Sequence, residues 1–159
     1  MITKPKGCYD VTGEVAKKYQ RICEVVSAYA KIYNYKYIRT PLFESTELFK
    51  RGVGDTTDIV QKETYDFTDR GGRCFTLRPE GTAGVVRNFI EDKLYGNQSS
   101  VVKEFYIGTM YRYERPGLGR NREFTQFGVE CLGSDDEMMD AEVISLSLIH
   151  IWRCRRLNR

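Results

Sequence analysis

Apolar side chains recur at helical spacing in two stretches of the sequence. Residues 13–33 follow Thr12, a residue type that caps helices, and residues 81–94 have the same spacing. Because a helix turns every 3.6 residues, steps of three and four predict an amphipathic helix in each stretch. Two acidic residues at 135–136 predict the cap of a last helix that starts near Glu137. The apolar positions are Val15, Tyr19, Ile22, Val26, Ala30 and Tyr33, then Val85, Val86, Phe89, Ile90 and Leu94.

Runs rich in β-branched and aromatic residues lie between these helices. A short strand over 35–39 is stopped by Pro41, and the runs on either side of an Arg-Gly-Gly turn predict a β-hairpin over 62–79. Two longer strands are predicted over 101–114 and 124–133. Strands and helices do not alternate in βαβ units, so we expect an α+β fold with an antiparallel β-sheet flanked by helices.

The two long strands each divide into an apolar and a polar face, because side chains two positions apart share a face. We expect Gly108 and Gly128 to leave room on the polar face for a ligand, since glycine has no side chain. A solvated face with weak surface ion pairs is the alternative. The polar face carries Gly108, Met110, Arg112 and Glu114 from the first strand, and Gln126, Gly128 and Glu130 from the second.

A third polar element follows the break at Pro79. Glu80 and Thr82 stand at the start of the predicted helix, in the run TLRPEGTA. These residue types are common helix caps, so a structural role and a ligand role both stay open. The Gly-rich loop predicted over 51–58 lacks the glycine spacing and the lysine of nucleotide-binding loops.

Composition limits the chemistry. The chain has 159 residues, enough for one domain, and 25 Lys+Arg against 22 Asp+Glu give a net charge of +3. The only histidine, His150, and the only tryptophan, Trp152, lie in the last 15 residues together with four arginines and no acid. We therefore interpret residues 145–159 as a non-native tail and residues 1–144 as the domain. Without histidine, this domain has no Ser-His-Asp triad and no histidine-ligated metal.

The sequence also predicts where the protein works. No apolar run approaches the roughly 18–20 residues of a membrane-spanning helix, and no apolar stretch follows the lysines of MITKPKGCYD. We therefore expect a cytoplasmic protein with no membrane association. Its five cysteines have no C-x-x-C spacing, which predicts free thiols and no resident metal site.

Three long segments resemble class II aminoacyl-tRNA synthetases, and the histidyl-tRNA synthetase family in particular. They are TPLFESTELFKRGVGDTTDIVQKETYDFTDRGGR, TLRPEGTAGVVR and YIGTMYRYERPGLGRNREFTQFGVECLG. The resemblance extends from residue 1 to about residue 144. It implies a motif 1 that ends at Pro41 and a motif 2 formed by YRYE at 111–114 and RNREF at 120–124. Tyr111 replaces the phenylalanine that is usual in the family.

The resemblance implies an ATP site around motif 2. Arg112 would be the catalytic residue and would bind both the α-phosphate of ATP and the carboxylate of the amino acid. Glu114 would contact the adenine side, Arg120 would bind the γ-phosphate, and Phe124 would stack on adenine. An arginine at the reacting phosphate stabilises the charge that develops during in-line displacement.

The resemblance also implies a histidine site. Glu80, Thr82 and Gln126 would hold the ammonium group of L-histidine, and Glu130 would accept a hydrogen bond from its imidazole. Gly81 would also belong to the substrate site. Mg2+ would bridge the ATP phosphates, and the loop 115–123 would meet the acceptor end of tRNA(His). The motif 1 region would form a homodimer.

The family's later parts have no counterpart in this sequence. Motif 3 with its arginine, a histidine-specific glycine-rich segment and the anticodon-binding domain are missing, so the resemblance covers an N-terminal part of a class II catalytic core. A fragment of this kind is expected to be inactive or poorly active alone.

Two other functions are weighed against histidine–tRNA ligation. A non-catalytic paralogue, such as the regulatory subunit of ATP phosphoribosyltransferase, would not need the full set of phosphate-binding residues. A bare RNA-binding module is disfavoured because residues 1–144 hold 21 basic and 22 acidic side chains, whereas nucleic-acid affinity depends on clustered Lys and Arg.

Overall fold

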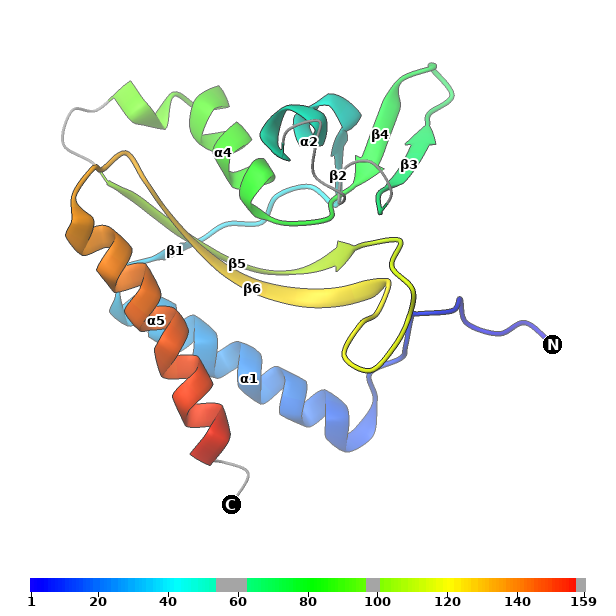
Figure 1. The fold of residues 1–159 in the computed structure, drawn as a ribbon, viewed down its shortest axis with the longest axis horizontal. Helices are drawn as coiled ribbons and strands as arrows, with labels where there is room; N and C mark the ends of the chain where they lie inside the picture. Colours follow the sequence, from blue (N-terminus) through cyan, green and yellow to red (C-terminus); the bar gives the residue numbers. More distant parts are fainter. Residues whose placement is uncertain (54–62, 97–100, 157–159) are drawn as a thin grey trace.

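The computed structural model describes most of the chain. The backbone is described for residues 1–53, 63–96 and 101–156, and the side chains for residues 1–50, 63–95 and 101–146. The described residues form two three-stranded sheets. Helices α1 (Gly13–Ile32) and α5 (Glu137–Arg156) lie on one side of the larger sheet, and α4 (Thr82–Glu91) lies on the other side with the smaller sheet (Figure 1). The α+β prediction and the three predicted helices are confirmed.

The larger sheet has the order β1 (Lys36–Tyr37), β5 (Val102–Tyr111), β6 (Glu123–Leu132). Strands β5 and β6 pair antiparallel along their full lengths, as the sequence predicts. The strand predicted over 35–39 is shorter and pairs with β5 in parallel, so this sheet is mixed. A parallel pair needs a long connection, and the smaller sheet with helix α4 supplies it.

The smaller sheet has the order β2 (Phe43–Ser45), β4 (Cys74–Leu77), β3 (Tyr65–Thr68), and all its pairs are antiparallel. The predicted hairpin is thus confirmed, and β2 adds a strand to it. Helix α2 (Thr46–Val53) follows β2 directly. This unit leads the chain from β4 into α4, whose first turn then faces the larger sheet.

A short 3-10 helix, η1 (Leu94–Gly96), follows α4. The Gly-rich loop predicted over 51–58 begins inside α2, and its residues 54–58 lie outside the described residues. No helix in the described part of the chain is long and apolar enough to cross a membrane.

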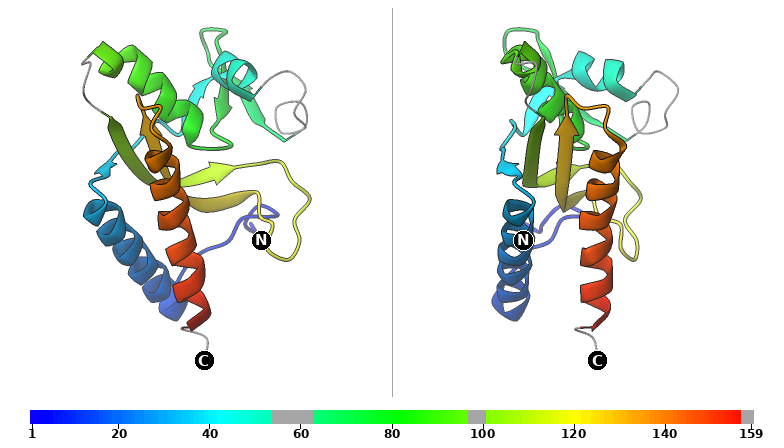
Figure 2. Two further views of the ribbon diagram at one scale, coloured as in Figure 1. Left: turned by 60° about the vertical axis from the view of Figure 1, so that its left-hand side comes forward. Right: turned by 90° about the vertical axis from the view of Figure 1, so that its left-hand side faces the viewer.

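Both faces of the larger sheet are covered by apolar side chains. Helices α1 and α5 lie on one face of this sheet (Figure 2). There Ala30 and Leu146 pack with Phe105 and Tyr35. Leu146 lies in the segment interpreted as non-native, yet only 1% of it is exposed. On the other face, Val85 of α4 packs with Tyr106 and Met110. The larger sheet is therefore packed on both faces, and the start of α4 is fixed on it.

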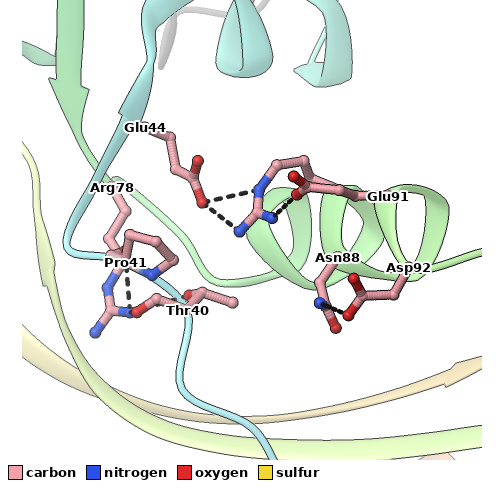
Figure 3. Close-up of polar contacts among 8 residues, drawn as sticks. Thr40, Pro41, Glu44, Arg78, Asn88, Glu91 and Asp92 are labelled. Atoms are coloured by element: carbon pink, nitrogen blue, oxygen red, sulfur yellow. Dashed lines mark hydrogen bonds and ion pairs between the residues drawn. The ribbon is translucent and has the colours of Figure 1, made fainter.

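The buried Arg78 joins the two sheets. Its Nη1 donates to the Thr40 carbonyl at 2.9 Å and to Thr40 Oγ1 at 3.1 Å (Figure 3), and its Nε donates to the Thr109 carbonyl at 2.9 Å. Burial lowers the pKa of Arg78. Figure 3 also shows Glu44 of β2 against α4, where it binds the Arg87 side chain at 2.8 Å. These contacts hold the segment between β4 and α4 in place.

Candidate functional site

The register of β5 and β6 places the expected polar side chains on one face of the larger sheet. Gly108 lies opposite Gln126, and residues directly opposite each other share a face. Glu130 shares that face because it stands an even number of positions after Gln126 on β6, and side chains alternate between the faces of a strand. Beyond β5, the N–H of Arg112 donates to the Arg122 carbonyl at 3.0 Å and extends the pairing. Arg112, Gln126 and Glu130 therefore line one surface.

The glycines on this face do not leave open space. A Cβ atom on Gly108 would lie 2.3 Å from Nη2 of Arg78, and one on Gly128 would lie 2.2 Å from Cζ of Tyr106. The expectation that both glycines leave room for a ligand is therefore wrong. Two of the protein's own side chains fill that room: Arg78, which directly follows β4, and Tyr106 of β5.

Tyr106 is held between two glycines. A Cβ on Gly81, at the start of α4, would also lie 2.2 Å from Cζ of Tyr106. The ring thus packs between the start of α4 and strand β6, and only 5% of Tyr106 is exposed. Its hydroxyl donates to Oε1 of Glu130 at 3.5 Å. Burial raises the pKa of Tyr106 to about 12, so the phenol is a hydrogen-bond donor at neutral pH.

Glu130 sits at the centre of a small hydrogen-bond network. Thr82 Oγ1 donates to Oε1 of Glu130 at 2.7 Å. Burial raises the pKa of Glu130, and the nearby charge of Glu80 adds to the effect, while the bonds from Thr82 and Tyr106 oppose it. The carboxyl group is therefore partly desolvated and held in one orientation by two hydroxyl donors. Such a group can select a ligand that donates a hydrogen bond.

Glu80 caps helix α4. Its Oε2 accepts from the Thr82 N–H and its Oε1 from the Ala83 N–H, both at 2.8 Å. These two bonds satisfy donors that a helix start leaves unpaired. The structural role left open by the sequence is thus present. A carboxylate oxygen accepts more than one hydrogen bond, so the capping role leaves Glu80 able to bind a cation as well.

Gln126 has an unused acceptor. Among the described residues, its Oε1 is buried and has no hydrogen-bond partner. An unpaired buried amide oxygen costs about 1–3 kcal/mol. A donor on a ligand would remove this cost.

Arg112 occupies the other end of the face. Its Nε donates to the Pro79 carbonyl at 2.9 Å, and its guanidinium lies 5.2 Å from the centre of the Phe124 ring. Glu114 lies 3.9 Å from Nη1 of Arg112 and 4.0 Å from Nε of Arg120. Arg112 is thus oriented by a carbonyl and an aromatic ring.

A cavity of about 650 Å3 opens beside these residues. Its lining includes Glu63, Arg112, Glu114, Arg120, Asn121 and Phe124. The lining combines two arginines, an aromatic ring and carboxylates, which are suited to an anion joined to a flat base. All four residues expected at the ATP site line this one cavity.

The two ends of the face carry the two sets of expected residues. Glu80, Gly81, Thr82 and Glu130 lie around Tyr106, whereas the four residues of the expected ATP site surround the cavity. Arg112 links the ends, because Pro79, whose carbonyl it binds, directly precedes Glu80.

Sequence reasoning missed Tyr106, Arg78 and Glu63. Tyr106 stands two positions before Gly108, so extending the alternation by one step finds it. Arg78 and Glu63 come from the segment between β2 and α4, and no local pattern connects them with β5.

The residues that the structure describes contain no group of three or more His, Cys, Asp and Glu side chains placed to hold a metal ion. The carboxylates of the cavity are Glu63 and Glu114. Two carboxylates do not form a protein cage for a divalent cation.

Comparison with known proteins identifies the family. A family model described as histidyl-tRNA synthetase matches residues 7–154. The histidine–tRNA ligase of Anoxybacillus flavithermus is 60% identical over 144 residues, which are 91% of this chain and 34% of that protein. The histidine–tRNA ligase of Geobacillus kaustophilus is 55% identical over 155 residues, 98% of this chain and 36% of that protein.

Solved structures show the same fold. The apo histidyl-tRNA synthetase of S. aureus matches with a TM-score of 0.79 and 42% identity, over 97% of this chain and 35% of that one. A Bacillus halodurans C structure described as an ATP phosphoribosyltransferase regulatory subunit/histidyl-tRNA synthetase also gives 0.79, with 27% identity over 96% of this chain and 38% of that one. The chain thus spans about a third of the length of the curated relatives it matches. With a family model that matches nearly all of it, the chain belongs to the histidyl-tRNA synthetase family.

Proposed function

We propose that this chain is the N-terminal part of the catalytic core of a histidine–tRNA ligase, an enzyme that joins L-histidine to tRNA(His) through a histidyl-adenylate. The observation that carries the proposal is the shared face of β5 and β6. Arg112, Gln126 and Glu130 project from it, beside Glu80 and Thr82 at the start of α4. This arrangement provides for an amino acid at one end and a nucleotide at the other.

ATP is proposed to bind in the cavity beside Arg112. The guanidinium would stabilise negative charge on the α-phosphate as the histidine carboxylate attacks it. Arg120, on the loop, would bind the γ-phosphate, and the adenine would stack on Phe124, which lies directly under Arg112. Glu114 would accept a hydrogen bond from the base. The carboxylate attacks, the bond to pyrophosphate breaks, and histidyl-AMP forms.

Histidine is proposed to bind at the other end. Its ammonium group would lie among Glu80, Thr82 and Oε1 of Gln126, a buried acceptor with no hydrogen-bond partner among the described residues. Glu130 would accept the imidazole N–H, and Thr82 and Tyr106 already hold its carboxyl group in position. Preorganised acceptors of this kind bind a ligand without loss of further side-chain freedom.

Mg2+ is proposed to reach this site with ATP. Mg2+ usually keeps several waters and binds through substrate phosphates and one or two carboxylates. Glu63, which lines the cavity and has no other role in the proposed site, fits that limited role. When bound, the ion would neutralise phosphate charge.

The remaining partners are also proposals. The loop 115–123 borders the cavity and would meet the acceptor end of tRNA(His). A homodimer through the motif 1 region is supported by exposed apolar side chains on α1: Val15, Ile22 and Ile32. A cytoplasmic location agrees with this activity.

A regulatory paralogue is the second candidate function. Two structures, one of them described as a regulatory subunit/synthetase, give the same TM-score, so the fold does not separate the two functions. The side chains favour the ligase, because Arg112, Glu114, Arg120 and Phe124 all line one cavity. A regulator that binds only histidine needs none of them.

Isothermal titration calorimetry on two variants tests the proposal. Each variant removes a charge from one end of the face: Glu130→Gln should weaken histidine binding by about tenfold or more and leave ATP binding unchanged, and Arg120→Gln should do the reverse. Histidine binding without any ATP binding in the wild-type chain would favour the regulatory paralogue. If both variants bound both ligands like the wild-type chain, the proposed site would be wrong.

A further inference from the structure

The N-terminal turn, residues 5–8, contacts the base of the loop between β5 and β6. Figures 1 and 2 show the N-terminal segment passing beside this loop. The turn is closed by the Cys8 N–H, which donates to the Pro5 carbonyl at 3.2 Å. Gly7 has a φ of +85°, a conformation that side-chain-bearing residues rarely adopt.

The Gly7 carbonyl accepts two hydrogen bonds from the end of the loop. The Arg122 N–H donates to it at 2.9 Å and the Glu123 N–H at 3.3 Å. The carbonyl of Arg122 accepts from the Arg112 N–H at 3.0 Å. One peptide unit therefore separates the N-terminal turn from the backbone of Arg112.

The Arg122 side chain fixes the other half of the loop base. Its guanidinium lies 4.2 Å from the centre of the Tyr113 ring, and its Nε donates to the Glu114 carbonyl at 3.1 Å. These contacts position the backbone on both sides of Glu114. The stem of Arg122 in turn packs against Gly7.

Neighbouring side chains leave no room for a Cβ atom on Gly7. A Cβ atom there would lie 2.8 Å from Cγ of Arg122 and 3.0 Å from Cγ of Pro116. Both atoms belong to the loop, so a side chain at this position would press on the loop and not on solvent.

We propose that the N-terminal turn is a positioning element for the loop 112–122, and that Gly7 is its central residue. It touches no ligand in this account and acts through Arg122, which holds the backbone of Arg112 and Glu114. The consequence for nucleotide affinity rests on the proposed function, whereas the effect on the loop does not. Small displacements of binding groups weaken a site strongly, so the loss should appear in ATP affinity.

The test compares Gly7→Ala with Gly72→Ala in the full 159-residue chain. Gly72 is a matched control, because its φ is +78° and nothing lies within 4 Å of a Cβ placed there. Amide hydrogen exchange is followed at Arg122 and Glu123, and the affinities for ATP and L-histidine are measured by calorimetry. A shortened chain that starts at Tyr9 is measured as well, because it removes the turn without adding backbone strain. It still tests the proposal if Gly7→Ala does not fold.

In Gly7→Ala and in the shortened chain, the Arg122 and Glu123 amides should exchange about tenfold faster, and ATP should bind about tenfold more weakly. Histidine, which meets only Arg112 of this loop, should bind less than about threefold more weakly. Gly72→Ala should change none of these values by more than about twofold. Unchanged exchange at Arg122 and Glu123 in both variants would overturn the proposal, as would an equal loss of both ligands. If the wild-type chain bound no ATP, the proposed function would fail, and the exchange rates would still decide the role of the turn.

Discussion

Replacing Gly128 by alanine should destabilise the protein by crowding Tyr106. The added Cβ would lie 2.2 Å from Cζ, 2.3 Å from the hydroxyl oxygen and 2.8 Å from Cε1 of the ring. The ring cannot move away, because Gly81 and the first turn of α4 lie against its other side. An overpacked core of this kind costs about 1–3 kcal/mol in the free energy of unfolding.

The assay is urea unfolding followed by fluorescence and circular dichroism. In thermal unfolding of a domain of about this size, each kcal/mol of lost stability lowers Tm by roughly 2–4 °C. Gly117→Ala is the control, since nothing lies within 4 Å of a Cβ at that glycine, and its free energy of unfolding should change by less than about 0.5 kcal/mol.

A double-mutant cycle with Tyr106→Ala tests the stated cause. Without the ring, Gly128→Ala should cost close to nothing, and the coupling between the two sites should be about 1–3 kcal/mol. If Gly128→Ala cost the same in both backgrounds, the reasoning from the Tyr106 contact would be refuted.

Two further predictions concern carboxylates. Because burial raises the pKa of Glu130 above its ordinary value of 4.5, the folded state binds a proton more tightly than the unfolded state, and ionisation of Glu130 lowers stability as pH rises above about 4.5. Glu130→Gln should therefore be more stable than the wild-type protein at pH 7, and this difference should shrink toward pH 4.5 in urea titrations; a difference independent of pH would contradict the assignment. Glu80→Ala removes both capping hydrogen bonds at the start of α4 and should lower the free energy of unfolding by about 1–2 kcal/mol. Glu80→Gln keeps one side-chain oxygen and should lower the free energy of unfolding less. Equal losses in the two variants would show that the carboxylate charge, not the side-chain oxygen, makes the cap.

Local patterns in the sequence predicted the elements that depend on neighbours in the chain. The spacing from Val15 to Tyr33 predicted α1, and the alternation in 101–114 and 124–133 predicted which side chains of β5 and β6 share a face. These signals are local because helices and pleated strands repeat every 3.6 and 2 residues.

The contacts that the sequence patterns did not predict join residues far apart in the chain. The sequence predicted open space for a ligand at Gly108 and Gly128, but that space is filled by the side chains of Arg78, which directly follows β4, and Tyr106. The parallel pairing of Lys36 with Glu104 likewise depends on how the intervening unit folds back. The alternation of side chains along a strand predicts which face each side chain lies on, but it does not predict which residues pack on that face.

A crystal structure with 5′-O-[N-(L-histidyl)sulfamoyl]adenosine, a stable mimic of histidyl-AMP, would show whether the shared face of β5 and β6 binds histidine at one end and the nucleotide at the other. We expect the imidazole at Glu130, the ammonium group beside Gln126 and Glu80, the sulfamate at Arg112 and the adenine on Phe124. An adenylate mimic bound away from the shared face of β5 and β6, or with its imidazole at the Arg112 end, would contradict this expectation.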